Sequence, residues 1–157
     1  MTFRFALMIS GALIAALPFG SPISAQDSGT VHEHHAAHAL DLDDNDGRKW
    51  TTDASLRKGM QSIRQSFQSR LPGFREKRLE SGQYEALADE VDKQLNYMFN
   101  NCDLPPEADA ELHKLLAFVS GAASGLRSEE NRRNGMMSLH RALDAYPEYF
   151  DHPGWAD

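Results

Sequence analysis

Cysteine, long apolar runs and positive charge are all scarce in this sequence. Its 157 residues include one cysteine, Cys102, which excludes an intrachain disulfide, a Cys-x-x-Cys redox pair and a cysteine-rich zinc site. The 16 Lys and Arg are outnumbered by 23 Asp and Glu, and the resulting formal charge of −7 disfavours nucleic acid as a partner, because phosphate binding needs a cationic surface. We therefore expect a domain held together by core packing.

The one long apolar run lies at the start of the chain, from Phe5 to Phe19. It follows Arg4 and precedes small residues that end at Ala25, which is the pattern of a secretory signal cleaved after Ala25. The run is shorter than the roughly 20 residues of a membrane span. We expect residues 1–25 to be a signal peptide, and the exported protein to be periplasmic, with no membrane span. Removal of Arg4 leaves 15 basic and 23 acidic side chains, a charge of −8.

Residues 26–49 are polar and acidic, and we expect them to form a disordered leader because they have little apolar surface to bury. Four of the seven histidines lie in this leader, at His32, His34, His35 and His38. Neutral imidazoles at this density bind Cu(II), Ni(II) or Zn(II), although a mobile segment has no fixed geometry to select one ion. The alternative is a solvated tail that is histidine-rich by accident. The acidic stretch 41–47 is not a calcium loop, because Leu42 occupies the position of its first oxygen ligand.

From Trp50 onward, apolar residues recur at spacings of three and four, which predicts four amphipathic helices. The predicted helices start at Asp53, Ser81, Pro105-Pro106 and Ser128 and end near Pro72-Gly73, Cys102, Leu126 and Pro147. Short connections favour an all-α fold, an antiparallel up-down-up-down four-helix bundle spanning residues 50–157. In this arrangement Trp50 and Trp155 lie near each other, and we expect them to plug one end of the bundle. Gly121 and Gly125 have a spacing that permits close approach between helices.

Helix geometry places several metal-binding residue types at one depth. Met60, His113 and His140 each lie seven residues from the same predicted end, or about 10 Å into the bundle, and Met98 lies about 6 Å from Cys102. Thioether, thiol and imidazole groups together favour copper, particularly Cu(I). The alternative is that the methionines fill the core and the histidines are ordinary boundary residues.

Cys102 is an unpaired thiol in a protein expected to be exported, where oxidation threatens it. It is therefore buried as a small apolar residue, paired between chains, or bound to metal. Burial is the preferred interpretation, because Cys102 continues the apolar stripe after Met98. Amide groups at the start of the third helix would favour its thiolate if metal were present.

Two segments resemble the periplasmic b-type cytochromes that are built as four-helix bundles. The stretch from Asp53 to Met60 is similar to that family's first helix, and Ala145-Tyr146 is similar to a pair near the end of its fourth. The resemblance implies haem with Met60 as an axial ligand. At the position of the second ligand, a histidine, this chain has Pro147, which has no ligand atom, so the family's haem site is broken. The chain also resembles small uncharacterised exported bacterial proteins that combine a histidine-rich leader with a helical domain.

These patterns favour a non-enzymatic, exported metal-binding protein that handles copper, with zinc or nickel as further ions for the leader. A b-type haem protein for electron transfer, using Met60 with His113 or His140, is one alternative. A structural or interaction module without a cofactor is another. No Ser/His/Asp set, phosphate loop or carboxylate pair suggests an enzyme.

Overall fold

The computed structural model describes residues 40–155, which form four α-helices. Their bounds are α1 (Ala54–Arg75), α2 (Ser81–Asn101), α3 (Pro106–Arg127) and α4 (Arg132–Tyr149). The predicted all-α fold is confirmed, and within the described range the β-structure is limited to two isolated bridges. None of the helices in this range is long and apolar enough to cross a membrane. The predicted signal peptide and the histidine tract lie outside the described residues.

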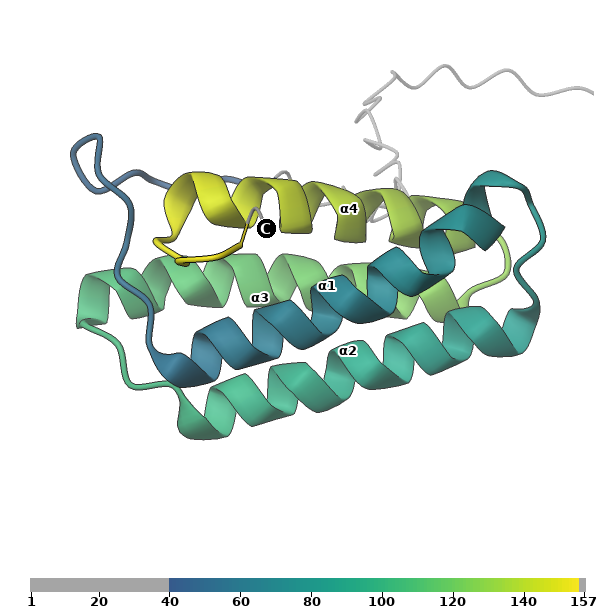
Figure 1. Cartoon of the computed structure of the whole chain (residues 1–157), viewed down its shortest axis with the longest axis horizontal. Helices are drawn as coiled ribbons and strands as arrows, with labels where there is room; N and C mark the ends of the chain where they lie inside the picture. The colour runs from purple at the N-terminus through teal and green to yellow at the C-terminus, as the bar shows by residue number, and fades with distance from the viewer. Residues whose placement is uncertain (1–39, 156–157) are drawn as a thin grey trace, which may run out of the picture. The chain divides into compact units, whose positions relative to one another are not determined.

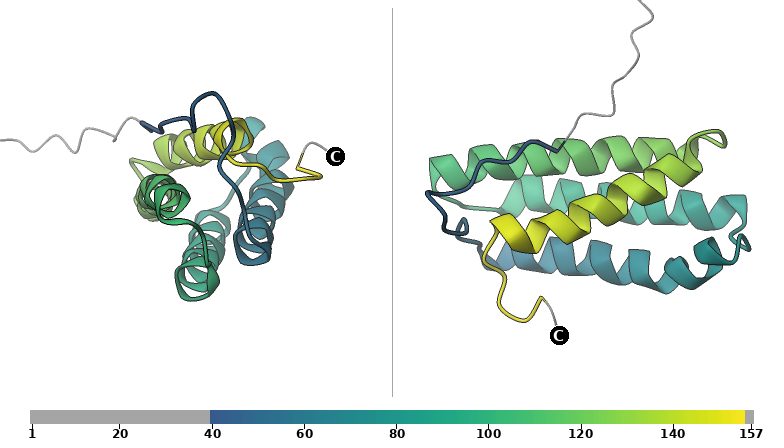
Figure 2. Two further views of the ribbon diagram at one scale, coloured as in Figure 1. Left: turned by 90° about the vertical axis from the view of Figure 1, so that its left-hand side faces the viewer. Right: turned by 90° about the horizontal axis from the view of Figure 1, so that it is seen from above.

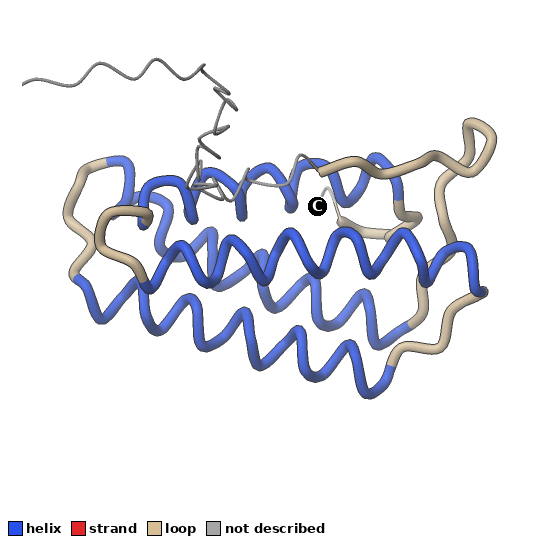
Figure 3. The backbone as a smooth tube through the Cα atoms, turned by 180° about the vertical axis from the view of Figure 1, so that it is seen from behind, coloured by secondary structure: helices blue, strands red, loops and turns tan. Residues whose placement is uncertain are grey.

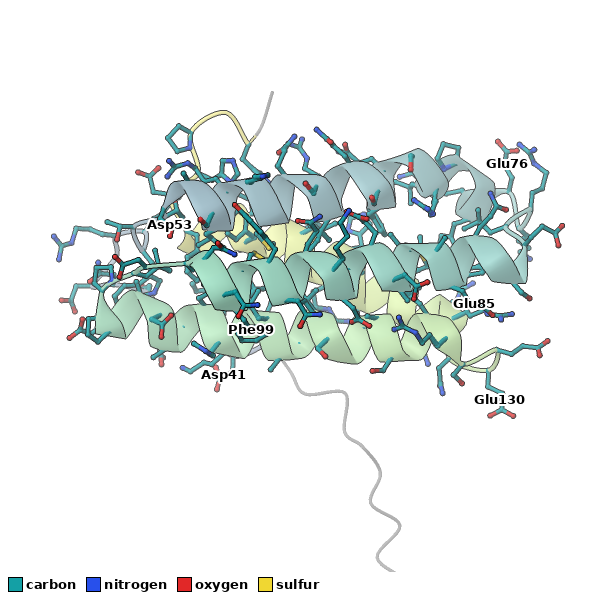
Figure 4. All side chains as sticks on the ribbon, turned by 90° about the horizontal axis from the view of Figure 1, so that it is seen from below. Asp41, Asp53, Glu76, Glu85, Phe99 and Glu130 are labelled. Atoms are coloured by element: carbon teal, nitrogen blue, oxygen red, sulfur yellow. The ribbon has the colours of Figure 1, made fainter. Side chains whose placement is uncertain are left out.

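The helices pack side by side, and consecutive helices follow one another around the bundle when it is viewed end-on (Figures 1 and 2). The connections lie alternately at the two ends, so Glu76, Glu85 and Glu130 appear at one end and Asp53 at the other (Figure 4). Arg132 at the start of α4 donates to Ser81 at the start of α2, as expected if these two ends coincide. Chain neighbours therefore form the main helix–helix contacts, whereas α1 and α4 contact each other much less.

Each helix buries one apolar stripe, and together the stripes form one core. The largest completely buried side chains come from all four helices and the segment after α4. They are Leu56, Met60, Ile63, Leu87, Met98, Leu112, Leu115, Leu116, Leu126, Met136, Tyr146 and Phe150. α3 and α4 approach most closely where Gly135 faces Gly125 and Leu126, with no side chain between the backbones. Gly121 borders open space, so of the predicted glycine pair only Gly125 lies at a close approach.

Helix starts were predicted well where a proline or a capping carboxylate marks them. Asp53 is the N-cap of α1, and its carboxylate accepts the Leu56 N–H at 2.6 Å. Pro106 is the first residue of α3. At α2, however, Glu80 is the N-cap and Ser81 is already helical, because Gln83 folds back to accept the Glu80 N–H at 2.9 Å.

The predicted ends at proline are two to three residues too early. α1 continues through Pro72 to Arg75, and α4 continues through Pro147 to Tyr149. A proline removes its own N–H donor and crowds the carbonyl four residues before it, but later residues can still donate, as Glu76 does to the Pro72 carbonyl at 3.1 Å. Similarly, Ser128 does not start α4, because it is the C-cap of α3 and a turn separates it from Arg132.

Residues 40–50, here called the N-terminal segment, pack against the bundle, contrary to the expectation of a disordered leader up to residue 49 (Figures 2 and 3). Leu42 is buried, and the Asp43 N–H donates to Glu111 of α3 at 3.0 Å. Lys114 pairs with both Asp43 and Glu111. Asp46 and Gly47 have φ of 53° and 78° in a two-residue turn, the conformation that an Asp-Gly pair favours. The described domain therefore extends upstream of Trp50.

Candidate functional site

Met60 and Met98 are completely buried, as their stripe positions predict. The Met98 side chain packs directly on the Gly59 backbone, since a Cβ built at Gly59 would lie 2.6 Å from the Met98 sulfur. The glycine therefore allows α1 and α2 to approach, and Met98 lies next to the residue that precedes Met60. Both thioethers serve as core filling in this arrangement.

His113 lies on the outer surface where α2 meets α3. Its Nδ1 is 2.8 Å from the Asp109 carbonyl and 3.4 Å from the Asp109 carboxylate, one turn away on the same helix. Its ring is 5.6 Å from that of Phe99 on α2, and both side chains are more than half exposed (Figure 4). His113 is therefore an ordinary residue at the helix boundary, which was the alternative to metal binding.

His140 lies at a different seam, between α4 and α1. Its Nδ1 is 2.6 Å from the Asp144 carboxylate, and its ring meets the edge of Phe67 at 5.5 Å. His113 and His140 thus share a predicted depth but face different helix pairs, and the structure does not bring them together. Within residues 40–155 there is no group of three His, Cys, Asp or Glu side chains placed to hold a metal ion.

Cys102 is half-buried at the C-cap of α2. Burial, followed by the nearby Asp53 carboxylate, raises the pKa of its thiol to about 12. This is the opposite of the expected effect of the α3 amides, because burial and the nearby carboxylates of Asp53 and Asp109 disfavour the thiolate. The thiol is therefore protonated at neutral pH, which does not favour a metal-binding thiolate.

A polar and aromatic cluster that the sequence interpretation missed lies at the end of α4. Tyr146 is completely buried, and its hydroxyl is 3.0 Å from Nδ1 of His152. Phe150 stacks on the Tyr146 ring at 5.4 Å, and Trp155 meets it at 4.7 Å. His152 was overlooked because it follows the last helix and belongs to no periodic stripe. The density of aromatic residues among the last twelve was the one available signal.

Burial is the main reason that this cluster is neutral. Burial, then the positive charges of Arg57 and Arg64, lower the pKa of His152, and Asp151 partly opposes them. Burial raises the pKa of Tyr146. At neutral pH both groups are uncharged, and the imidazole tautomer sets which of them donates in the hydrogen bond between the Tyr146 hydroxyl and Nδ1 of His152.

The two tryptophans do not plug the bundle end together. Trp50 joins the N-terminal segment to α4, since its backbone N–H donates to the Tyr149 carbonyl at 2.7 Å and its indole donates to Asp43. Trp155 instead packs against the Arg64 guanidinium, about 15 Å along α1 from its start. A pocket of about 250 Å³ lies beside it, lined by Lys49, Pro147, Phe150, Asp151, His152, Gly154 and Trp155. The prediction for Trp155 is therefore wrong, because this residue covers the side of the bundle.

Comparisons with protein families, curated proteins and solved structures found no match to this chain. The resemblance to b-type cytochromes therefore stays a prediction. The described residues do not fit a haem held as that resemblance implies: Met60 is enclosed by core side chains, and both candidate histidines lie at the surface, bonded to their own helices.

Proposed function

We propose that this protein is an exported, non-enzymatic metal-binding protein that captures copper through His32, His34, His35 and His38. The observation that carries the proposal is the presence of four imidazoles within seven residues of an acidic chain. Imidazole is a good ligand for Cu(II), and also for Zn(II) and Ni(II), so we expect a site of low selectivity. The negative charge of the chain favours the approach of cations.

The four-helix domain serves as the anchor in this proposal. The tract ends at His38, two residues before Leu40, which packs against the core. The contacts of Asp43 with Glu111 and Lys114 then fix the chain on α3. Met60 and Met98 stabilise the core, and Cys102 stays a protonated thiol. The copper site earlier predicted from these residues with His113 and His140 has no role here, because the two imidazoles face different seams.

Calorimetric titration of residues 26–157 with Cu(II), Zn(II) and Ni(II), and with Cu(I) under anaerobic conditions, tests the proposal. Replacing the four tract histidines by alanine should weaken Cu(II) binding by more than the roughly 10- to 100-fold that loss of a supporting interaction costs. A matched control replaces His113 and His140 by alanine, and a second replaces Met60 and Met98 by leucine. Neither control should change the Cu(II) affinity.

Two results would overturn the proposal. One is Cu(II) binding weaker than micromolar by the intact chain, which would favour the cofactor-free module. The other is tight binding that survives loss of the tract histidines. If Cu(I) binding falls in the methionine variant alone, the metal site lies in the core and the anchor role is wrong.

A further inference from the structure

Residues 150–155, here called the C-terminal strap, lie on the bundle after α4 ends. Trp155 contacts Tyr146 of α4 and Arg64 of α1, so the strap bridges two helices that contact each other much less than chain neighbours do. Trp155 is 7% exposed although it is almost at the end of the chain. The strap therefore covers apolar surface that α1 and α4 do not cover for each other.

Three sets of contacts hold the strap in place. At its start, the Asp151 N–H donates to the Trp50 carbonyl at 2.8 Å. In its middle, Nδ1 of His152 and the hydroxyl of buried Tyr146 share a hydrogen bond of 3.0 Å. At its end, the Arg64 guanidinium stacks on the Trp155 ring and donates to the Trp155 carbonyl. Of these contacts, only the one at His152 changes its chemistry near physiological pH.

The charged groups around His152 come from several elements. Arg57 and Arg64 of α1 act on it as cations, and Lys49 of the N-terminal segment lines the same pocket. Asp151 on the strap is the acidic neighbour that favours protonation. The other titratable groups at this end are Asp53, Cys102 and Tyr146; the thiol and the phenol are neutral at the relevant pH. The cations thus outnumber the carboxylates that could stabilise an imidazolium.

We propose that the C-terminal strap is an acid-sensitive latch, in which protonation of His152 releases Trp155 from the α1–α4 seam while the four helices stay folded. A doubly protonated imidazole can only donate to the Tyr146 oxygen, and it carries a positive charge that is partly buried between the rings of Tyr146 and Trp155. It also places this charge near Arg57 and Arg64. Acidification therefore adds repulsion and a partly desolvated charge to the strap, and the contacts of these six residues are few enough to open locally. The latch is independent of the proposed metal capture.

The direction of the pH dependence follows from the lowered pKa of His152. Between this folded value and the unfolded value of about 6.5, the released strap binds more protons than the closed one. The closed strap is therefore fully stabilised above about pH 6.5 and loses this stabilisation as the pH falls through the folded pKa. One proton can change the opening equilibrium by at most about tenfold per pH unit.

A nuclear magnetic resonance titration of the whole chain from pH 7.5 to 4.5 tests the latch. The His152 ring signal and the Trp155 indole signal should move with one shared midpoint below about pH 6.5. Over the same range, hydrogen exchange at Asp151 should accelerate relative to Val91 in the core, after correction for intrinsic rates. The far-UV circular dichroism should stay constant, because the helices remain intact.

Three variants decide whether His152 is the cause. His152→Gln should abolish the pH-dependent movement of Trp155, whereas His140→Gln, the matched control on α4, should preserve it. Arg57→Gln should raise the shared midpoint towards 6.5, since the positive charge of Arg57 lowers the pKa of His152. The latch is disproved if Trp155 stays fixed while His152 titrates, if its movement persists in His152→Gln, or if it coincides with loss of helix.

Discussion

At the scale of single residues, the close approach of the α3 and α4 backbones depends on Gly135. A Cβ at this position would lie 2.7 Å from the Leu126 nitrogen and 2.9 Å from the Ala122 oxygen, both of which are backbone atoms of α3. Backbone cannot move aside as a flexible side chain can, so Gly135→Ala must separate α3 from α4. We expect a loss of about 2–3 kcal/mol in the free energy of unfolding, measured by urea denaturation.

Gly121 supplies the control for this prediction. It is also a helical glycine, but a Cβ there would meet no atom within 4 Å. Gly121→Ala should therefore stabilise the protein by about 0.5–1 kcal/mol through helix propensity alone. Equal effects of the two substitutions would show that α3 and α4 do not approach as closely as the structure indicates.

The sequence predicts how far along a helix a residue lies, but it predicts only partly on which side of the helix the side chain lies. The apolar stripes correctly predicted that Met60 and Met98 are buried, because a stripe defines its own inward face. His113 and His140 flank their stripes on the boundary, and the sequence does not say which neighbouring helix a boundary residue meets. His152 was not predictable at all, because its contact with Tyr146 requires the chain to reverse after α4.

At the scale of elements, the end of α1 shows what a proline rule misses. After Pro72 the helix closes with two backbone hydrogen bonds, from Lys77 to Phe74 at 3.0 Å and from Arg78 to Gly73 at 2.8 Å. This is a Schellman motif, in which glycine usually occupies the residue with positive φ. Here that residue is Lys77, with φ of 54°, so the sequence contains no glycine to mark the true end.

Lys77→Gly should therefore stabilise the protein. The left-handed conformation costs a residue with a Cβ about 1 kcal/mol and glycine almost nothing, and the Lys77 side chain is exposed. We expect a gain of about 0.5–1 kcal/mol in the free energy of unfolding, measured by thermal and urea denaturation. Lys77→Ala retains the Cβ and should give no gain. A similar gain in both variants would attribute the effect to the removed charge instead.

At the scale of the whole molecule, the helix count and the all-α class followed from periodicity because each helix has to bury its own stripe. The packing of the two segments that flank the helices could not be predicted in this way, because short irregular segments have no hydrophobic periodicity. Leu42, in the segment before α1, and Trp155, in the segment after α4, are both buried. The limits of the domain are therefore set by contacts outside the helices.

The C-terminal strap stabilises the bundle by covering the interface between α1 and α4, which Trp155→Ala tests. Trp155 is 7% exposed and joins Arg64 of α1 to Tyr146 of α4, so its loss leaves a cavity between two helices that make few contacts with each other. We expect a loss of about 3 kcal/mol in the free energy of unfolding at pH 7.5, followed by circular dichroism in urea. Phe99→Ala is the matched control, because Phe99 is an aromatic residue that is 55% exposed, and it should change stability by less than about 0.5 kcal/mol. If the two substitutions cost the same, the strap does not stabilise the bundle, and Trp155 rests on a seam that α1 and α4 already close without it.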